Sequence, residues 1–241
     1  MTTLFISDLH LEADRPDIGD QFINFLKTDA MEADDVYILG DLFEAWVGDD
    51  DPNTHYSKIK QAIRKVVDKG IPVYFMHGNR DFMIGRQFAN ETGVIILKDP
   101  YPVQMYGQKA LLSHGDAMCT DDTQYQRVRV MTRNPDWQAS MLAKPLKERL
   151  LIAEEARRQS LEQTINMSLA IMDVNKDEVV RVIKKYGVDV LVHGHTHRPD
   201  VHTIDLGNRK AKRIVLGDWY TQGSVLRWDL RGPRLQEMPR S

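Results

Sequence analysis

Short apolar runs and longer amphipathic stretches alternate along most of the chain. The runs are rich in β-branched and aromatic residues and occupy positions 4–6, 36–39, 73–76, 111–112, 188–192 and 214–216. Uninterrupted apolar runs of this length predict strands that are buried on both faces of a sheet. Between several of them, apolar residues recur at helical spacing over 18–26, 59–67 and 179–186. This alternation predicts an α/β fold in which helices cover a layered sheet.

Other segments predict further strands and one loose end. The segment around Pro102, Tyr106 and Gly107 predicts a β-hairpin. Positions 200–230 predict more strands, with turns at Gly207 and Gly217. The C-terminal residues 231–241 are mostly polar, and we expect them to be loosely held.

One segment departs from the alternation of strand and helix. Between 121 and 172 the chain has no strand signal, and 121–133, 136–143 and 145–172 predict helices that are separated near Pro135 and Pro145. Proline suits the first turn of a helix. We therefore expect a body formed by 1–120 and 173–241, and a helical insertion, or cap, formed by 121–172.

The composition excludes several classes of protein. Of the 241 residues, 42% are apolar, which is too many for a disordered chain, and one is cysteine, which is too few for an internal disulfide. No apolar run approaches the roughly 18 residues that span a bilayer, and the first residues lack the pattern of a signal peptide. The net charge of -3 gives no general reason to bind nucleic acid. We expect a cytoplasmic protein with no cleaved leader.

Five polar clusters each follow an apolar run. They are Asp8-Leu9-His10, Gly40-Asp41, Gly78-Asn79-Arg80-Asp81, His114-Gly115-Asp116 and Gly194-His195-Thr196-His197-Arg198-Pro199. Taken singly, most of these are also ordinary turn sequences. In α/β sheets, however, the carboxyl ends of the strands form the ligand crevice, so we expect the clusters to converge in space.

Seven side chains in these clusters are suitable metal ligands: Asp8, His10, Asp41, Asn79, His114, His195 and His197. The set mixes oxygen and nitrogen donors without a thiolate, which favours Mn, Fe, Co or Zn over a structural zinc site. If one carboxylate bridges, the donors form two sites. Two ions about 3.5–4 Å apart can activate a shared water and hold phosphate oxygens. The other histidines are expected to pack at strand ends (His77, His193) or to be peripheral (His55, His202).

In this order, the clusters resemble those of the calcineurin-like metallophosphoesterase superfamily. The similarity is closest to its branch of UDP-2,3-diacylglucosamine diphosphatases, which act in lipid A biosynthesis of Gram-negative bacteria. It is carried by 4–11, 37–51 (YILGDLFEAWVGDDD), 77–82 (HGNRDF), 114–122 (HGDAMCTDD), 168–175 (SLAIMDVN) and 193–199 (HGHTHRP). The resemblance extends over essentially the whole chain and is weakest between 134 and 165. It implies a layered β-sandwich flanked by helices.

The resemblance also implies a reaction. The pyrophosphate bond of UDP-2,3-diacylglucosamine would be hydrolysed to UMP and 2,3-diacylglucosamine 1-phosphate (lipid X), by attack of metal-activated water on the α-phosphorus. One Mn ion would be held by Asp8, His10, Asp41 and His197, and a second by Asp41, Asn79, His114 and His195, so that Asp41 bridges. The catalytic residues would be Asp41, Asn79, Arg80, His114 and His195.

Substrate contacts are implied in the same way, at Asn79, Arg80, Asp122, Ser160 and His195. Two positions depart from the branch, because Thr164 and Met167 stand where its members often have Asn and Lys. Arg157 or Arg158 is a candidate cation in place of that Lys. Arg80 replaces a His of many superfamily members, and an arginine side chain keeps its proton in proteins, so it cannot act as an acid. It can donate a fork of hydrogen bonds to phosphate, which suits a phosphate leaving group.

The apolar residues of the insertion leave two interpretations open. Trp137, Met141, Leu142, Leu146, Leu150 and Leu151 recur at helical spacing. They either line a surface for acyl chains or membrane lipid, or pack the cap onto the body. Basic residues outnumber acidic ones between Arg127 and Arg158, which favours contact with an anionic membrane surface. We expect a monomer at the cytoplasmic face of the inner membrane.

Two alternatives remain for the function. The chain could be a dinuclear metallophosphoesterase that acts on another nucleotide diphosphate or on a phosphodiester. It could instead be a binding scaffold without catalysis, but such a scaffold should have lost metal ligands, and all seven are present here.

Overall fold

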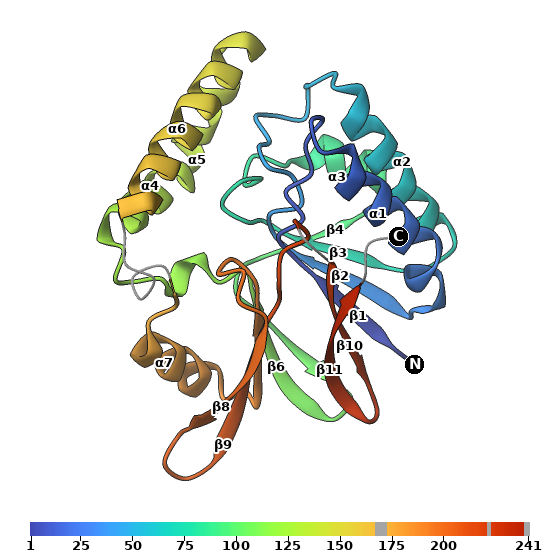
Figure 1. Cartoon of the computed structure of the whole chain (residues 1–241), viewed down its shortest axis with the longest axis vertical. Coiled ribbons are helices and arrows are strands. Elements are labelled where there is room, and N and C mark those ends of the chain that lie inside the picture. Colours follow the sequence, from blue (N-terminus) through green and yellow to red (C-terminus); the bar gives the residue numbers. More distant parts are fainter. Residues whose placement is uncertain (167–172, 221–222, 239–241) are drawn as a thin grey trace.

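Two β-sheets face each other, and helices cover the outer face of each (Figure 1). A computed structural model describes residues 1–166, 173–220 and 223–238 of the chain. Within this part the apolar side chains gather in three clusters, one between the sheets and one beneath the helices on either side. The α/β layered fold that the hydrophobic pattern predicts is confirmed.

The first sheet has six strands in the order β11-β10-β1-β2-β3-β4. Its parallel strands are β1 (Thr3–Ile6), β2 (Asp35–Leu39), β3 (Val73–Met76) and β4 (Ile95–Leu97). Two antiparallel strands complete it, β10 (Gly223–Asp229) beside β1 and β11 (Gly232–Met238) at the edge.

The second sheet has five strands in the order β5-β6-β7-β9-β8. Strands β6 (Gln108–Ser113), β7 (Val190–His193) and β9 (Lys210–Val215) are parallel. The antiparallel edges are β5 (Tyr101–Met105), which forms the predicted hairpin with β6, and β8 (Asp200–Asp205), which pairs with β9. Both sheets therefore bring the carboxyl ends of parallel strands to the same region.

Alternate residues of the central strands point to opposite faces of the sheet. In β1, Leu4 and Ile6 join the cluster under the helices, whereas Phe5 lies between the two sheets. In β7 the division is the same, because Val190 and Val192 face the first sheet. Both faces of these strands are buried, which explains why they appear in the sequence as uninterrupted apolar runs.

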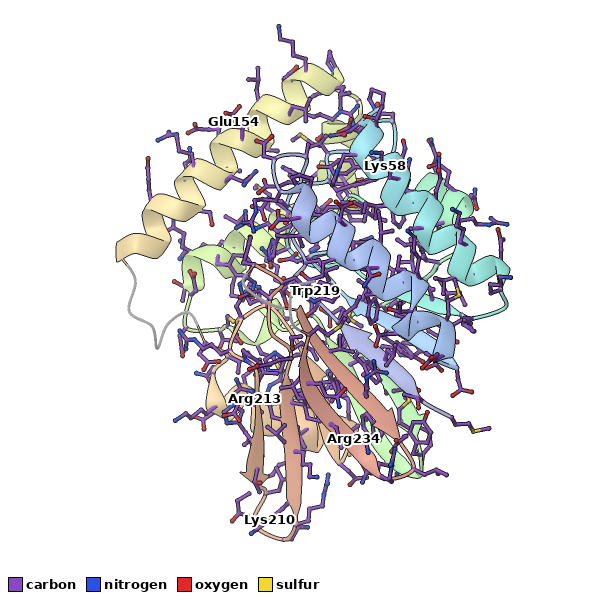
Figure 2. The ribbon with its side chains drawn as sticks, turned by 45° about the vertical axis from the view of Figure 1, so that its right-hand side comes forward. Lys58, Glu154, Lys210, Arg213, Trp219 and Arg234 are labelled. Atoms are coloured by element: carbon purple, nitrogen blue, oxygen red, sulfur yellow. The ribbon has the colours of Figure 1, made fainter. Side chains whose placement is uncertain are left out.

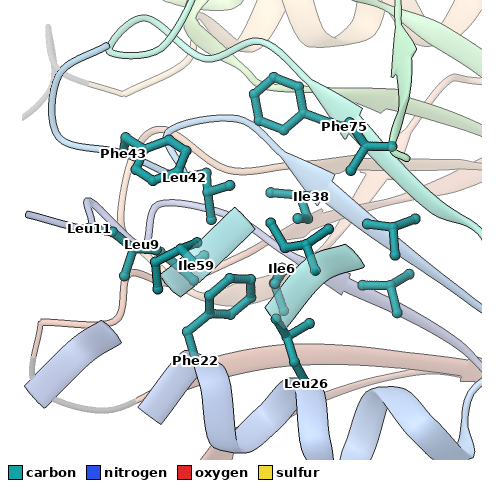
Figure 3. Packing of buried hydrophobic residues seen from close by; sticks show 14 of the residues in the cluster. Ile6, Leu9, Leu11, Phe22, Leu26, Ile38, Leu42, Phe43, Ile59 and Phe75 are labelled. Atoms are coloured by element: carbon teal, nitrogen blue, oxygen red, sulfur yellow. The ribbon is translucent and has the colours of Figure 1, made fainter. Parts of the chain in front are cut away.

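Helices α1 (Pro16–Lys27), α2 (Thr54–Asp68) and α3 (Arg86–Thr92) cover the first sheet, and α7 (Lys176–Tyr186) covers the second. Figure 3 shows Phe22 and Leu26 of α1 packed against the strand residues Ile6 and Ile38. The ends of α7 follow from local chemistry. Asn175 accepts hydrogen bonds from the first backbone N–H groups of the helix, and Gly187 ends it in the left-handed conformation, at φ 62°.

The segment after the second short 3-10 turn, η2 (Asp116–Met118), contains three helices that extend beside the body (Figure 1). They are α4 (Thr123–Thr132), α5 (Pro135–Leu142) and α6 (Leu146–Asn166), close to the predicted bounds. Residues 167–172 of the third predicted helix lie outside the described residues. Asp122 and Asn134 cap the amino ends of α4 and α5 through their side chains.

The apolar residues of this segment divide between the two interpretations that the sequence leaves open. Met141 is buried in the cluster under the helices, and Trp137 packs against it, so these two attach α5 to the body. Most of the strongly exposed large apolar side chains of the described residues lie on α4 to α6: Val128, Val130, Met131, Leu142, Leu150, Leu151 and Ile152. Figure 2 shows the charged residue Glu154 on the exposed surface of α6, while Trp219 is in the interior.

The expectation of a loose C-terminal tail is wrong for residues 232–238. They form β11, which pairs with β10 over its full length, from Gly232 opposite Asp229 to Met238 opposite Gly223. The backbone of β10 supplies hydrogen bonds that the polar composition of the tail does not reveal, and Leu235 packs against the core between the sheets. The sequence pattern also does not predict α3 or β4, since both are short and have few buried residues.

Candidate metal centre

All seven predicted donors lie in loops that directly follow parallel strands. Asp8 and His10 follow β1, Asp41 follows β2, Asn79 follows β3, His114 follows β6, and His195 and His197 follow β7. The strands belong to both sheets, so the donors meet where the two sheets end side by side. The predicted convergence of the five clusters is thus observed.

The carboxylate and imidazole donors form two groups. One contains Asp8, His10 and His197, and the other contains Asp41, His114 and His195. Within each group one ligand atom per residue lies within 4.8 Å of the others. Groups of three N and O donors at this spacing, without a thiolate, match the ligand chemistry of borderline divalent metals.

Asp41 lies between the two groups. Its Oδ2 is 3.6 Å from Nε2 of His114, in its own group, and 3.8 Å from Nε2 of His10, in the other. Its second oxygen, Oδ1, accepts a 2.8 Å hydrogen bond from the backbone N–H of Arg80. One oxygen is therefore held by the loop after β3, and the other faces donors on both sides.

Asn79 supplies an amide oxygen to the second group. Its Oδ1 lies 2.9 Å from Nε2 of His114 and 2.8 Å from Nδ1 of His195. An amide oxygen, a carboxylate and two imidazoles thus face one another at this point. The family resemblance implies this same mixed set as the ligands of the second ion.

The backbone at the donor loops is strained. Five of the seven predicted donors have positive φ angles: Asp8 (57°), His10 (50°), Asp41 (53°), His195 (68°) and His197 (54°). Few non-glycine residues adopt this left-handed conformation, and such strain persists only where the surrounding structure imposes it. Its concentration at one set of donors is an independent sign of a functional site.

Two glycines permit the close approach of the loops. A Cβ atom on Gly78 would lie 2.1 Å from Oδ1 of Asp41, and one on Gly194 would lie 2.2 Å from Oδ2 of Asp8. Neither distance leaves room for a side chain. The glycines in the HGN and HGHTH motifs are therefore required by the carboxylates that pack against them.

Hydrogen bonds behind the donors orient their rings and carboxylates. Nδ1 of His114 donates to the carbonyl oxygen of Leu39 at 2.9 Å, which leaves Nε2 as the ring nitrogen that faces Asn79 and Asp41. Asp8 accepts from the backbone N–H of His195 at 2.9 Å and from the hydroxyl of Ser7. These two donors are thus held in place by groups outside the donor set or by the backbone.

The centre carries an excess of negative charge. Burial alone lowers the pKa of His114, but the carboxylates of Asp41, Asp116 and Asp8 outweigh it and raise that pKa to about 9. For Asp8, burial acts to raise the pKa, but the neighbouring histidines, His197 first, bring it well below the ordinary value. Carboxylates that draw protons onto imidazoles in this way would attract divalent cations equally, and metal binding displaces those protons.

Two buried aspartates support the donor loops without facing the centre. Asp81 accepts hydrogen bonds of 2.8 Å from the backbone N–H groups of Gly78 and Leu42. Asp116 accepts from the hydroxyl of Tyr125 at 2.7 Å and from Nε of Arg129 at 2.8 Å. Both aspartates belong to the predicted clusters, but their supporting role depends on contacts that the sequence pattern does not show.

Helix α4 contacts the donor loops directly. The ring of Tyr125 stacks on that of His195, with centroids 5.9 Å apart, and Arg133 donates a 2.8 Å hydrogen bond to the carbonyl oxygen of Gly78. Tyr125 and Arg133 were not predicted as site residues. Their contacts show that the insertion is attached to the loops that carry Asn79 and His195.

The predicted substrate residues lie in different surroundings. Arg80 is partly exposed beside Asp41, whereas Asp122 caps α4 by accepting from Tyr125 N at 2.8 Å. Nε of Arg157 is 3.0 Å from Oε1 of Glu44, and Ser160 is exposed on α6. The side chain of Thr164, and the whole of Met167, lie outside the described residues.

The histidines His77 and His193 pack at strand ends, as predicted. His77 donates from Nε2 to the carbonyl oxygen of Ile84 at 2.8 Å. His193 donates from Nδ1 to the carbonyl oxygen of Gly194 and accepts from Arg213 at 3.0 Å. Burial, followed by the charge of Arg213, lowers the pKa of His193 to about 3, so it stays neutral.

A family model described as calcineurin-like phosphoesterase matches residues 1–199. The chain belongs to this family. The matched segment includes all seven predicted donors of this calcineurin-like phosphoesterase. The resemblance and the fold class inferred from the sequence motifs are confirmed.

Curated relatives of this calcineurin-like phosphoesterase carry the name UDP-2,3-diacylglucosamine hydrolase. The protein of that name from Stenotrophomonas maltophilia (strain K279a) is 47% identical over 247 residues, which cover 100% of both chains. The one from Xanthomonas oryzae pv. oryzae (strain PXO99A) is 48% identical over 244 residues, 98% of this chain and 99% of the relative. The one from Xanthomonas campestris pv. campestris (strain 8004) is 47% identical, with 99% of each chain covered.

Among the helices of the described residues, none combines the length and the apolar character needed to cross a bilayer.

Proposed function

We propose that this phosphoesterase hydrolyses the pyrophosphate bond of UDP-2,3-diacylglucosamine and releases UMP and 2,3-diacylglucosamine 1-phosphate (lipid X). The observation that carries the proposal is full-length similarity, at 47–48% identity, to relatives named for this substrate. The seven donors at the strand ends supply a centre suited to cleavage at phosphorus. In this role the protein is a hydrolase of lipid A biosynthesis.

The centre is proposed to hold two Mn²⁺ ions. Asp8, His10, Asp41 and His197 would bind one ion, and Asp41, Asn79, His114 and His195 the other, because Asp41 faces both groups. Such a pair of ions would supply activated water and neutralise the charge of the phosphate oxygens. The donor set suits Mn²⁺ and also Fe²⁺, Co²⁺ or Zn²⁺, so restoration of activity after chelation decides the metal.

The protein's own side chains are proposed to hold the pyrophosphate in place. The guanidinium of Arg80 projects from the loop whose backbone N–H binds Asp41, so it is positioned beside the centre. It would donate to the charge that develops on the phosphate, since it cannot give up a proton. The leaving phosphate monoester is a weak base and needs little protonation.

The three helices between η2 and the segment before α7 are proposed to receive the acyl chains. The exposed apolar side chains of α4 to α6 support this, together with the contacts of Tyr125 and Arg133 to the donor loops. Asp122, Arg157, Ser160, Thr164 and Met167 are the proposed contacts to the sugar and its phosphate. The basic surplus of the segment supports a peripheral position on the cytoplasmic face of the inner membrane, as a monomer.

The direct test incubates the purified protein with Mn²⁺ and UDP-2,3-diacylglucosamine and measures UMP by chromatography. A UDP-sugar without acyl chains serves as the matched substrate. We expect UMP from the diacylated substrate and far slower release from the other. Equal turnover of both, or turnover of other nucleotide diphosphates only, would favour the alternative phosphoesterase function.

A variant tests the shared carboxylate. Asp41→Ala removes an oxygen donor that faces both groups, so we expect activity to vanish and the affinity of both metal sites to fall. Asp68→Ala is the matched control, because Asp68 is exposed and pairs with Arg64 of its own helix, α2, rather than with a donor. Substantial activity in Asp41→Ala would contradict the bridging role.

A further inference from the structure

Glu44 is a buried carboxylate that no metal group includes. It lies in the loop after β2, three residues beyond Asp41, and its exposed fraction is 6%. Its Oε2 is 2.6 Å from Nδ1 of His10. A carboxylate only accepts hydrogen bonds, so Nδ1 of His10 carries the proton and donates it to Glu44.

The position of this hydrogen bond determines which ring nitrogen of His10 faces the centre. With Nδ1 protonated, the lone pair is on Nε2. Nε2 lies 3.2 Å from Nε2 of His197 and 3.8 Å from Oδ2 of Asp41. Without an acceptor at Glu44, the ring could take the other tautomer or rotate, and its lone pair would leave the donor group.

The second oxygen of Glu44 faces two arginines. Oε1 is 3.0 Å from Nε of Arg157, on α6, and 3.9 Å from Nη1 of Arg80. Glu44 is thus held between the imidazole of His10 at one oxygen and two cationic side chains at the other.

We propose that Glu44 is a positioning residue, which holds His10 in the metal-binding tautomer with one oxygen and ties α6 to the donor loops through Arg157 with the other. The proposal rests on the metal-dependent function proposed above. A carboxylate behind a ligating imidazole orients the ring and increases its basicity. The contact to Arg157 adds a link from the insertion to the same imidazole.

The two oxygens of Glu44 are expected to contribute unequally to metal binding. The His10 contact is buried, and loss of such a partner weakens metal binding by about 10- to 100-fold. The side chain of Arg157 is 44% exposed, so its ion pair is screened by solvent. Exposed pairs contribute little, and we expect loss of Arg157 to weaken metal binding by less than about 5-fold.

The experiment measures Mn²⁺ affinity by calorimetry on the full-length chain, with wild type, Glu44→Gln, Glu44→Ala and Arg157→Gln compared. Glu91→Gln is the matched control, because Glu91 pairs with Lys60 at 2.6 Å away from the centre. Circular dichroism and thermal melts confirm that each variant is folded. The amide oxygen of Gln can still accept from His10, so this variant separates the hydrogen bond from the charge.

We expect one of the two Mn²⁺ affinities to fall by about 10- to 100-fold in Glu44→Ala, less in Glu44→Gln, and not at all in Glu91→Gln. Two ions in wild type with an unchanged affinity in folded Glu44→Ala would overturn the positioning role and leave the proposed metal function intact. An equal loss of Mn²⁺ affinity at both sites would also overturn it, because the donor that Glu44 contacts, His10, belongs to one of the two groups. Failure of wild type to bind Mn²⁺ would overturn both proposals.

Discussion

Arg149 anchors the start of α6 to the body, and its replacement by methionine tests how the insertion is held. The side chain is 2% exposed, although it carries a charge. Nη1 donates to the carbonyl oxygen of Val47 at 2.6 Å and to Oδ1 of Asp50 at 2.8 Å, and Nε donates to the carbonyl oxygen of Lys144 at 3.1 Å. Methionine keeps much of the length and loses every donor.

The expected loss of stability in Arg149→Met follows from these contacts. Breaking a buried ion pair costs about 3–5 kcal/mol when the remaining charge stays buried. The Asp50 side chain is 60% exposed, so water can solvate it after the change, and the cost falls toward that of the hydrogen bonds alone. We expect the free energy of unfolding to drop by about 2–3 kcal/mol, which lowers the Tm of a chain this size by about 4–12 °C.

Urea denaturation and thermal melts measure the change, and hydrogen exchange over 146–160 locates it. Arg158→Met is the matched control on the same helix. Arg158 pairs with Glu155 at 2.7 Å and with Glu162 at 2.6 Å, but its side chain is 58% exposed. Exposed pairs of this kind contribute about 0–1 kcal/mol.

Two results would contradict the anchoring role of Arg149. If Arg149→Met and Arg158→Met lose the same free energy of unfolding, burial of the guanidinium does not stabilise the anchor. If Arg149→Met changes hydrogen exchange in the sheets but not over 146–160, the reasoning about α6 is also refuted.

Three further outcomes follow from single side chains. Gly78→Ala should abolish divalent metal uptake, measured by calorimetry, because its Cβ would lie 2.1 Å from Oδ1 of Asp41; normal uptake would show that the loop can move aside. Tyr125→Phe should lower the free energy of unfolding in urea by about 1–2 kcal/mol, since the buried carboxylate of Asp116 loses a 2.7 Å donor. Burial, and to a smaller extent the negative charge of Asp116, raises the pKa of Cys119 to about 12. The native thiol should therefore resist a thiol reagent at pH 8 and react only in urea, and rapid native labelling would contradict this.

The local sequence pattern was sufficient to predict those elements in which successive residues are buried in the same way. The apolar runs of β1, β2, β3 and β7 predict central strands because both of their faces are buried. The strand β11 was missed for the opposite reason. It lies at a sheet edge and has a single neighbour, β10, so only its backbone pairing and Leu235 reveal it as a strand.

The candidate donors were predictable for a topological reason. Parallel strands direct their carboxyl ends to one edge of a sheet, so polar clusters that follow such strands meet even when far apart in sequence. His10 and His197 illustrate this, with Nε2 atoms 3.2 Å apart across the chain. The division of the donors into two groups, with Asp41 between them, needed the three-dimensional arrangement.

Periodicity and loop chemistry are local properties, so the sequence alone was enough to predict the layered α/β fold, helices over 121–172 and seven candidate donors. Which side chains hold the donor loops and the insertion in place depends on the three-dimensional fold. Glu44, Tyr125 and Arg149 act through partners on other elements, and the local sequence pattern does not show those partners, although Glu44 lies within the motif at 37–51. Such contacts depend on how the insertion and the two sheets pack together, and therefore on distances in space, which spacing in sequence does not encode.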